Sequence, residues 1–116
     1  MLLTTLLFSL LMGAPQLERP HLTVAQGYIE SNMNRRARGK AGEKGAFQVR
    51  EKYWGKVPKD LKGQAFQSER IMNELLKNCG GDLFLAVAKY NGSGDASFRY
   101  ARKVRQRSIE SAVIRV

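Results

Sequence analysis

The stretch Tyr28-Ile29-Glu30-Ser31, followed by Gly39-Lys-Ala-Gly-Glu-Lys-Gly-Ala-Phe-Gln48, is the most informative part of this sequence. Glu30 stands at the end of an apolar run that predicts a helix over residues 20–31. The glycine-rich, polar segment that follows cannot continue as a regular helix. A carboxyl at such a boundary is either a solvated helix end or an acid partly removed from water. In the second case desolvation raises its pKa, and an acid of that kind can protonate a glycosidic bond.

Length, composition and charge limit the class of protein. The chain has 116 residues, enough for one domain, and its 43% hydrophobic and 26% charged residues are ordinary for a folded protein. The net charge of +10 indicates attraction to a polyanion, which can be nucleic acid, anionic lipid or an acidic wall polymer. Cys79 is the single cysteine, which excludes an internal disulfide and favours a buried filler over a nucleophile. With His21 as the single histidine, no cluster of soft metal ligands is possible, and we expect neither a metal nor an organic cofactor.

The N-terminal residues form a separate apolar segment. Residues 1–12 read Met-Leu-Leu-Thr-Thr-Leu-Leu-Phe-Ser-Leu-Leu-Met and precede Gly13-Ala14-Pro15. The run is similar to the apolar part of an export signal, although no Lys or Arg precedes it, and it is too short to span a bilayer comfortably. We predict that residues 1–16 are an export signal or a short membrane anchor, with membrane association through residues 1–14. The alternative is a first buried helix of the domain.

Apolar residues at helical spacing predict four helices in the rest of the chain. The first covers residues 20–31, with Pro20 in its first turn, and the second covers about 64–78. The third follows Asp82, a suitable N-cap, and its apolar residues 83–90 predict a central helix. The last covers about 96–107. The side chains expected to face the core are Leu22, Ala25, Ile29, Phe66, Ile71, Met72, Leu75, Leu76, Phe98, Ala101 and Val104.

The segment between the first two helices has a different pattern. Ala46-Phe47-Gln48-Val49 has the residue types of a short strand or an extended turn, and Tyr53-Trp54 predicts a connection with partly buried aromatic rings. The expected fold class is therefore mainly α. It is a helical domain with a short β-hairpin or extended segment after the helix that carries Glu30.

Three motifs, in order and at fitting distances, resemble a known family. They are Glu30-Ser31 at a helix end, Gly42-Glu-Lys-Gly45-Ala-Phe-Gln48, and Ala88-Lys-Tyr90-Asn91-Gly92. The lytic transglycosylases with the soluble lytic transglycosylase type of domain have Glu-Ser, Gly-x-x-Gly-x-x-Gln and Ala-x-Tyr-Asn-x-Gly. Tyr100-Ala-Arg-Lys-Val104 also looks like the closing helix of that family. The resemblance covers about residues 20–107.

The resemblance implies an α+β, lysozyme-like fold and a defined reaction. Residues 17–107 would form the transglycosylase domain, and residues 108–116 a C-terminal tail. The expected activity is cleavage of the bond between N-acetylmuramic acid and N-acetylglucosamine in peptidoglycan without water, which leaves a 1,6-anhydro end. The implied location is the periplasm or cell envelope, or a virion. The implied partners are peptidoglycan strands and a phage particle or a secretion or conjugation complex.

The same resemblance implies roles for five residues. Glu30 would be the catalytic acid and then the base, and the hydroxyl of Tyr90 would hold it in orientation. Ser31 and Gln48 would donate or accept hydrogen bonds in the substrate groove. Asn91 would belong to the substrate-binding set while also stabilising the end of its helix.

The sequence departs from the family pattern at several positions in the groove. The family often has Ser where this chain has Gly39, Ala where it has Glu43, and a small residue where it has Lys89. The usual Leu-Met before the glutamine is Ala46-Phe47. These departures put the sugar contacts in doubt more than the role of Glu30.

Other functions remain open from the sequence. Glu43 could be a second carboxylate, which would make the protein a hydrolytic muramidase that adds water. A basic nucleic-acid-binding module would use the outward Arg and Lys residues of the last helix, but no nucleic-acid motif is present and the aromatic residues are expected to be buried. A catalytically inactive wall-binding assembly factor with the same fold is the third alternative.

Overall fold

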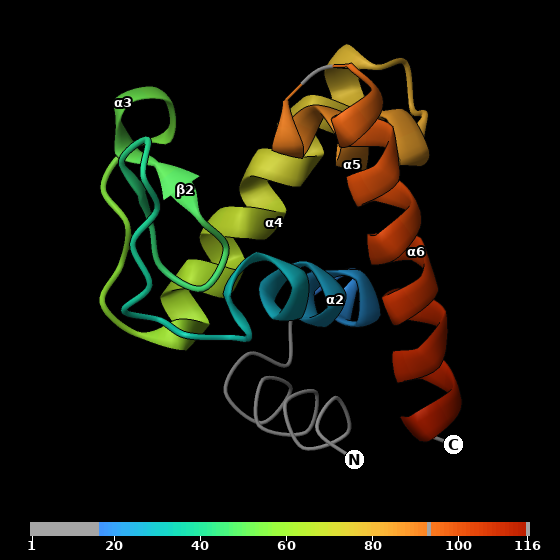
Figure 1. The fold of residues 1–116 in the computed structure, drawn as a ribbon, viewed down its shortest axis with the longest axis horizontal. Helices are drawn as coiled ribbons and strands as arrows, with labels where there is room; N and C mark the ends of the chain where they lie inside the picture. The colour runs from blue at the N-terminus through green and yellow to red at the C-terminus, as the bar shows by residue number, and fades with distance from the viewer. Residues whose placement is uncertain (1–16, 93, 116) are drawn as a thin grey trace.

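The computed structural model describes residues 17–92 and 94–115, with side chains as far as residue 109 (Figure 1). The predicted signal or anchor over residues 1–16 lies outside the described residues. The described chain is mainly helical with one two-stranded antiparallel sheet, which confirms the predicted class. Its elements are α2 (Pro20–Ser31), β1 (Glu43–Lys44), β2 (Val49–Arg50), α3 (Glu51–Trp54), α4 (Leu61–Asn78), α5 (Leu83–Asn91) and α6 (Asp95–Arg115).

Local sequence signals explain where the helices begin and end. Pro20 occupies the first turn of α2, as predicted, where its missing N–H costs no hydrogen bond. The Asp82 carboxylate accepts a hydrogen bond of 3.0 Å from the Leu85 N–H and caps α5, also as predicted. Asp60 caps α4 in the same way through the Gly63 N–H, at 3.2 Å. At the other end of α2, Asn32 adopts a left-handed conformation with φ of 56° and ends the helix directly after Glu30-Ser31.

The helices are arranged around α4. Figure 1 shows α4 running diagonally through the molecule, with the hairpin and α3 on one side and α2 and α6 on the other. The core has two parts. One joins the hairpin to α2 and α4, and the other joins α2, α4, α5 and α6. The largest fully buried apolar side chains are Phe47, Met72, Val24 and Val104.

Several side chains and boundaries differ from the sequence prediction. Phe66 and Phe98 are 36% and 39% exposed rather than inward. The reason at α4 is that its inner face carries Gln64 and Gln67, whose amides bind loop carbonyls. Phe98 instead stacks on Phe84 near the surface, with ring centroids 6.2 Å apart.

Two helices also differ from the prediction, α6 in its length and α5 in its position. Helix α6 continues to Arg115, through residues assigned above to a C-terminal tail, because no Gly or Pro follows Gly94 to stop it. Helix α5 packs on α4 and α6 at one end of the molecule, and Leu83 is 41% exposed, so α5 is not central. Among the described helices, none is long and apolar enough to cross a bilayer.

Candidate active site

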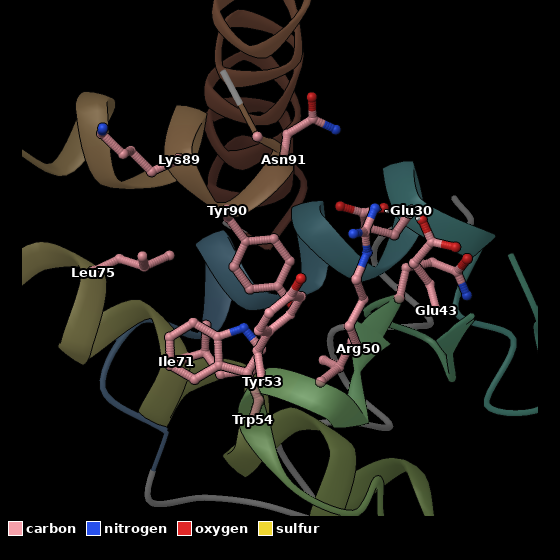
Figure 2. Close-up of a pocket in the computed structure, with 13 residues that line it drawn as sticks. Glu30, Glu43, Arg50, Tyr53, Trp54, Ile71, Leu75, Lys89, Tyr90 and Asn91 are labelled. Atoms are coloured by element: carbon pink, nitrogen blue, oxygen red, sulfur yellow. Dashed lines mark ion pairs between the residues drawn. The ribbon is translucent and has the colours of Figure 1, made fainter. Parts of the chain in front are cut away.

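A pocket of about 280 Å³ lies where the end of α2, the hairpin, α4 and α5 meet (Figure 2). Of the five residues predicted for the site, Glu30, Gln48, Tyr90 and Asn91 line it, whereas Ser31 does not. Figure 2 shows the side chains of Glu30, Glu43 and Arg50 on one side and the apolar residues of α4 on the other. The lining residues are Glu30, Glu43, Gln48, Val49, Arg50, Tyr53, Trp54, Ile71, Leu75, Lys89, Tyr90, Asn91 and Gly92.

Glu30 is the carboxyl of the pocket whose pKa is raised. It occupies the last turn of α2 and is partly buried. Burial raises its pKa from 4.5 to about 7, an interaction with the Tyr100 hydroxyl opposes this, and the negative charge of Glu43 adds to it. Glu30 is therefore close to half protonated at neutral pH. A carboxyl in this condition can both donate and accept a proton.

Tyr100 and Gln26 form a buried polar layer beneath Glu30. Tyr100 is 7% exposed and Gln26 is 1% exposed. The Tyr100 hydroxyl lies near enough to the Glu30 carboxyl to favour its charged form, yet it makes no hydrogen bond of good geometry within the described residues. The Gln26 amide nitrogen is likewise unsatisfied. Burial raises the pKa of Tyr100 well above its usual range, so this phenol stays protonated.

The sequence does not single out Tyr100 as a site residue. The signal that could have found it is its spacing, because Tyr100, Ala101 and Val104 share one buried stripe of α6. Because α6 packs on α2, this stripe places the Tyr100 phenol near the side of α2 that carries Glu30. Residue type alone does not distinguish such a tyrosine from an ordinary core aromatic.

Tyr90 is in the pocket but has a different partner from the one predicted. Its hydroxyl donates to the Phe47 carbonyl at 2.9 Å and lies 3.3 Å from Ser68 Oγ. Burial raises the pKa of Tyr90, and the charge of Glu30 raises it further, so the two side chains are near each other without a described hydrogen bond. Tyr90 thus fixes the turn of the hairpin to α5 and α4. Of the two tyrosines, Tyr100 is the one that interacts directly with the carboxyl.

Ser31 also acts on the hairpin turn rather than on the pocket. Its hydroxyl donates to the Ala46 carbonyl at 2.7 Å and accepts from the Asn34 N–H at 3.0 Å. Gln64 holds the same turn from α4, since its Oε1 accepts from the Ala46 N–H at 2.8 Å. The Gln64 amide nitrogen donates to the carbonyls of Arg35 and Pro58. The turn that precedes Gln48 is therefore bound to both α2 and α4.

Gln48 and Asn91 present polar groups to the pocket. Gln48 has a φ of 50°, and its amide nitrogen donates to the Gly45 carbonyl at 2.9 Å. That bond orients the side chain and leaves its oxygen able to accept from a ligand. Asn91 is exposed at the end of α5. Both positions suit hydrogen bonds to hydroxyl or acetamido groups.

Glu43 is a second carboxylate in the pocket, with acidity opposite to that of Glu30. Hydrogen bonds from its own backbone N–H and from that of Ala41, together with Arg50, lower its pKa. Its Oε1 accepts from the Ala41 N–H at 2.9 Å, and its Oε2 lies 3.7 Å from Arg50 Nη2. Glu43 is therefore ionised when Glu30 is about half protonated. Two carboxyls with separated pKa values in one pocket are a common arrangement for acid–base chemistry.

A further side of the pocket is formed by two aromatic residues that the sequence does not single out as site residues. Tyr53-Trp54 is expected there only as a partly buried connection, yet both rings line the pocket and Tyr53 is 62% exposed. An exposed aromatic ring beside hydrogen-bonding groups suits the apolar face of a sugar. Arg50 and Lys89 add positive charge to the rim. The sequence feature that could have predicted this side of the pocket is the aromatic pair Tyr53-Trp54, which follows the hairpin closely in sequence.

The two carboxyls of the pocket, one with a raised pKa and one with a lowered pKa, can transfer a proton to and from a bound ligand. Within residues 17–92 and 94–115, no group of three His, Cys, Asp or Glu side chains could hold a metal ion. Comparison of the chain with protein-family models, with curated proteins and with solved structures gave no match.

Proposed function

We propose that this protein is a peptidoglycan lytic transglycosylase with a lysozyme-like fold and that Glu30 is its catalytic acid and base. The observation that carries the proposal is the Glu30 carboxyl, with a pKa of about 7, in a pocket to which three segments distant in sequence contribute side chains. Those segments are the end of α2, the hairpin and the end of α5, which hold the three motifs behind the family resemblance.

The surroundings of Glu30 fit a two-step reaction. In the first step the protonated carboxyl donates its proton to the glycosidic oxygen, and the bond between that oxygen and the muramoyl anomeric carbon breaks. In the second step the carboxylate accepts the proton of the muramoyl 6-hydroxyl while this oxygen bonds to the anomeric carbon. No water is consumed, and Glu30 returns to its protonated state. A single carboxyl serves both steps because the nucleophile belongs to the substrate.

The other pocket residues support binding of a glycan. Gln48 and Asn91 offer hydrogen-bonding groups, and Tyr53 and Trp54 offer ring faces on the opposite side. The positive rim from Arg50 and Lys89 suits the carboxylates of peptide stems on the wall polymer. An exported protein in the cell envelope, or one carried by a phage particle or a secretion or conjugation complex, would meet this substrate.

A hydrolytic muramidase is the second candidate, and one observation favours it. Glu43 is an ionised carboxylate in the same pocket and raises the pKa of Glu30 through its charge. Such a carboxylate could activate a water molecule or stabilise a positive sugar intermediate. The products distinguish the two reactions, because the transglycosylase product is lighter than the hydrolysis product by one water.

The proposal is tested by digesting purified peptidoglycan with the full chain and with its Glu30→Gln variant. We expect anhydro-muropeptides from the parent and about a 100-fold or greater loss of product in the variant, because the proton donor is absent. A matched control is Glu74→Gln, which changes an exposed glutamate of α4 outside the pocket and should leave activity unchanged.

Mass spectrometry of the muropeptides separates the outcomes. Hydrated products that require both Glu30 and Glu43 would establish the muramidase. No products from the parent, under conditions in which a reference enzyme is active, would refute both enzymatic functions. The remaining candidate would then be a basic module that binds wall or nucleic acid without catalysis.

A further inference from the structure

Helix α4 has two opposite faces with different properties. Ile71 and Leu75 line the pocket. Successive residues of a helix are about 100° apart, so side chains two positions away point to nearly the opposite side. The opposite face therefore contains Glu69 and Asn73, together with the other residues of α4 that point in the same direction. The exposed side chains of this outer face are Lys62, Phe66, Arg70, Asn73 and Lys77.

The segment that precedes α2 is attached to this outer face. Leu17 is 7% exposed and belongs to the core cluster that contains Phe47 and Ile71. The Glu18 N–H donates to Glu69 Oε1 at 2.7 Å. The Arg19 guanidinium donates to Asn73 Oδ1 at 2.8 Å. Glu18 and Arg19 are thus bound to the side of α4 that faces away from the pocket, and residues 1–16 precede them in the sequence.

The chemistry of the outer face matches that of an anionic lipid surface. Lys62, Arg70 and Lys77 are exposed and make no described ion pair, and Arg19 adds a fourth cation beside them. Phe66 lies between these cations, and its exposed ring suits the boundary between headgroups and acyl chains. Of the nearby acids, Glu69 is buried and accepts a hydrogen bond from the Glu18 N–H, while Glu18 and Glu74 are exposed, so four cations stand against two exposed carboxylates. Positive charge therefore predominates.

We propose that the outer face of α4, together with residues 17–19, lies on a membrane surface with anionic headgroups and that the pocket faces away from this membrane. The apolar residues 1–12 come shortly before this segment in the sequence, so their hydrophobic attachment and the electrostatic attraction of the outer face would act together. A single apolar segment of this length benefits from a second, basic contact. This orientation goes beyond the proposed function and stands whether or not the pocket is catalytic.

The first test measures binding of the full chain to vesicles that contain phosphatidylglycerol. The variant K62Q/R70Q/K77Q should bind about 100-fold more weakly, at about fivefold for each cation removed near the surface. The matched control R99Q/R102Q/K103Q removes the same charge from the exposed side of α6 and should bind within a fewfold of the parent. Equal losses in both variants would overturn the proposal, because attraction would then depend on net charge and not on this face. Vesicles of phosphatidylcholine alone should bind all three proteins equally weakly.

The second test reads the orientation directly and does not depend on the triple variants folding. Trp54 is the single tryptophan and lines the pocket, so brominated lipids should leave the fluorescence of the parent protein unquenched. The variant F66W/W54F carries its indole on the outer face of α4 and should be quenched on binding. The proposal is wrong if the parent is quenched and the variant is not, or if both are quenched alike.

Discussion

At the scale of single residues, the acidity of Glu30 is the property that decides what the pocket can do. Its raised pKa has one main cause, which is removal from water at the end of α2. Tyr100 opposes the shift and Glu43 adds to it, so the final value depends on α6 and on the hairpin as well as on α2. The pKa of about 7 therefore belongs to the folded site and not to the Glu-Ser dipeptide.

This acidity predicts a pH-dependent effect of Glu30→Gln on stability. The folded pKa is raised from 4.5 to about 7, so the contribution of Glu30 is fully present below its unfolded pKa and is lost as pH rises through the folded pKa. Glutamine is a neutral substitute of the same shape. Above about pH 8 the variant should be more stable than the parent by up to about 3 kcal/mol, whereas below about pH 4 the two should agree.

Urea unfolding across this pH range measures the difference. A companion variant, Tyr100→Phe, removes the hydroxyl that favours the carboxylate and should move the midpoint of the Glu30 titration to higher pH. Its own stability should change little, because the hydroxyl is buried without a well-formed hydrogen bond. Parallel stability curves for the parent and Glu30→Gln would show that the pKa of Glu30 is not raised.

At the scale of elements, the hairpin is held together by contacts that come from several helices. Ser31, Gln64 and Tyr90 each bind the backbone of its turn. Just before the hairpin, Gly39 lies against the ends of two flexible side chains. A Cβ there would collide with Glu43 Oε1 and lie 2.7 Å from Gln48 Oε1. Gly39 and Glu43 are two of the positions that depart from the pattern of the family this chain resembles, and the structure brings them into contact.

This contact predicts a non-additive pair of substitutions. Gly39→Ser alone should destabilise the protein by about 1 kcal/mol, because Glu43 must give up its bond to the Ala41 N–H or its contact with Arg50. Glu43→Ala removes the obstacle, so the double variant should recover about 1 kcal/mol relative to the sum of the single changes. A double-mutant cycle by chemical unfolding measures this coupling. Additive effects would mean that the two positions are independent.

At the scale of the whole molecule, the pocket lies between the two parts of the core. Leu75 and Tyr90 pack against both parts and also line the pocket. The second global property is charge, because a net charge of +10 on 116 residues makes the compact state repel itself.

The charge predicts a stabilising effect of simple salt. Raising NaCl from about 20 mM to about 0.5 M shortens the Debye length to a few ångströms and should raise Tm by several degrees. The variant K62Q/R70Q/K77Q has fewer repelling charges and should show a smaller rise. Thermal unfolding followed by circular dichroism measures both. A Tm that falls with added NaCl would show that attractive ion pairs outweigh the repulsion.

The sequence by itself determined several of the helix ends and the order of the motifs. Pro20, Asp82 and the glycines around the hairpin act on the backbone within a few residues, so their effects follow from residue type and spacing. The position of Glu30 at a helix end is of the same kind. The C-terminal end of α6 was missed although its signal, the lack of Gly and Pro, is also local.

Only the tertiary structure decided the environment of each side chain. In the folded chain Tyr100 lies beside Glu30, and the Tyr90 hydroxyl donates to the Phe47 carbonyl. Phe66 faces outward, while Gln64 on the inner side of α4 binds the loop backbone. The physical reason is that burial and pKa depend on groups distant in sequence, while periodicity describes one helix at a time. A helical pattern tells which residues share a face, but packing decides whether that face meets the core, the pocket or water.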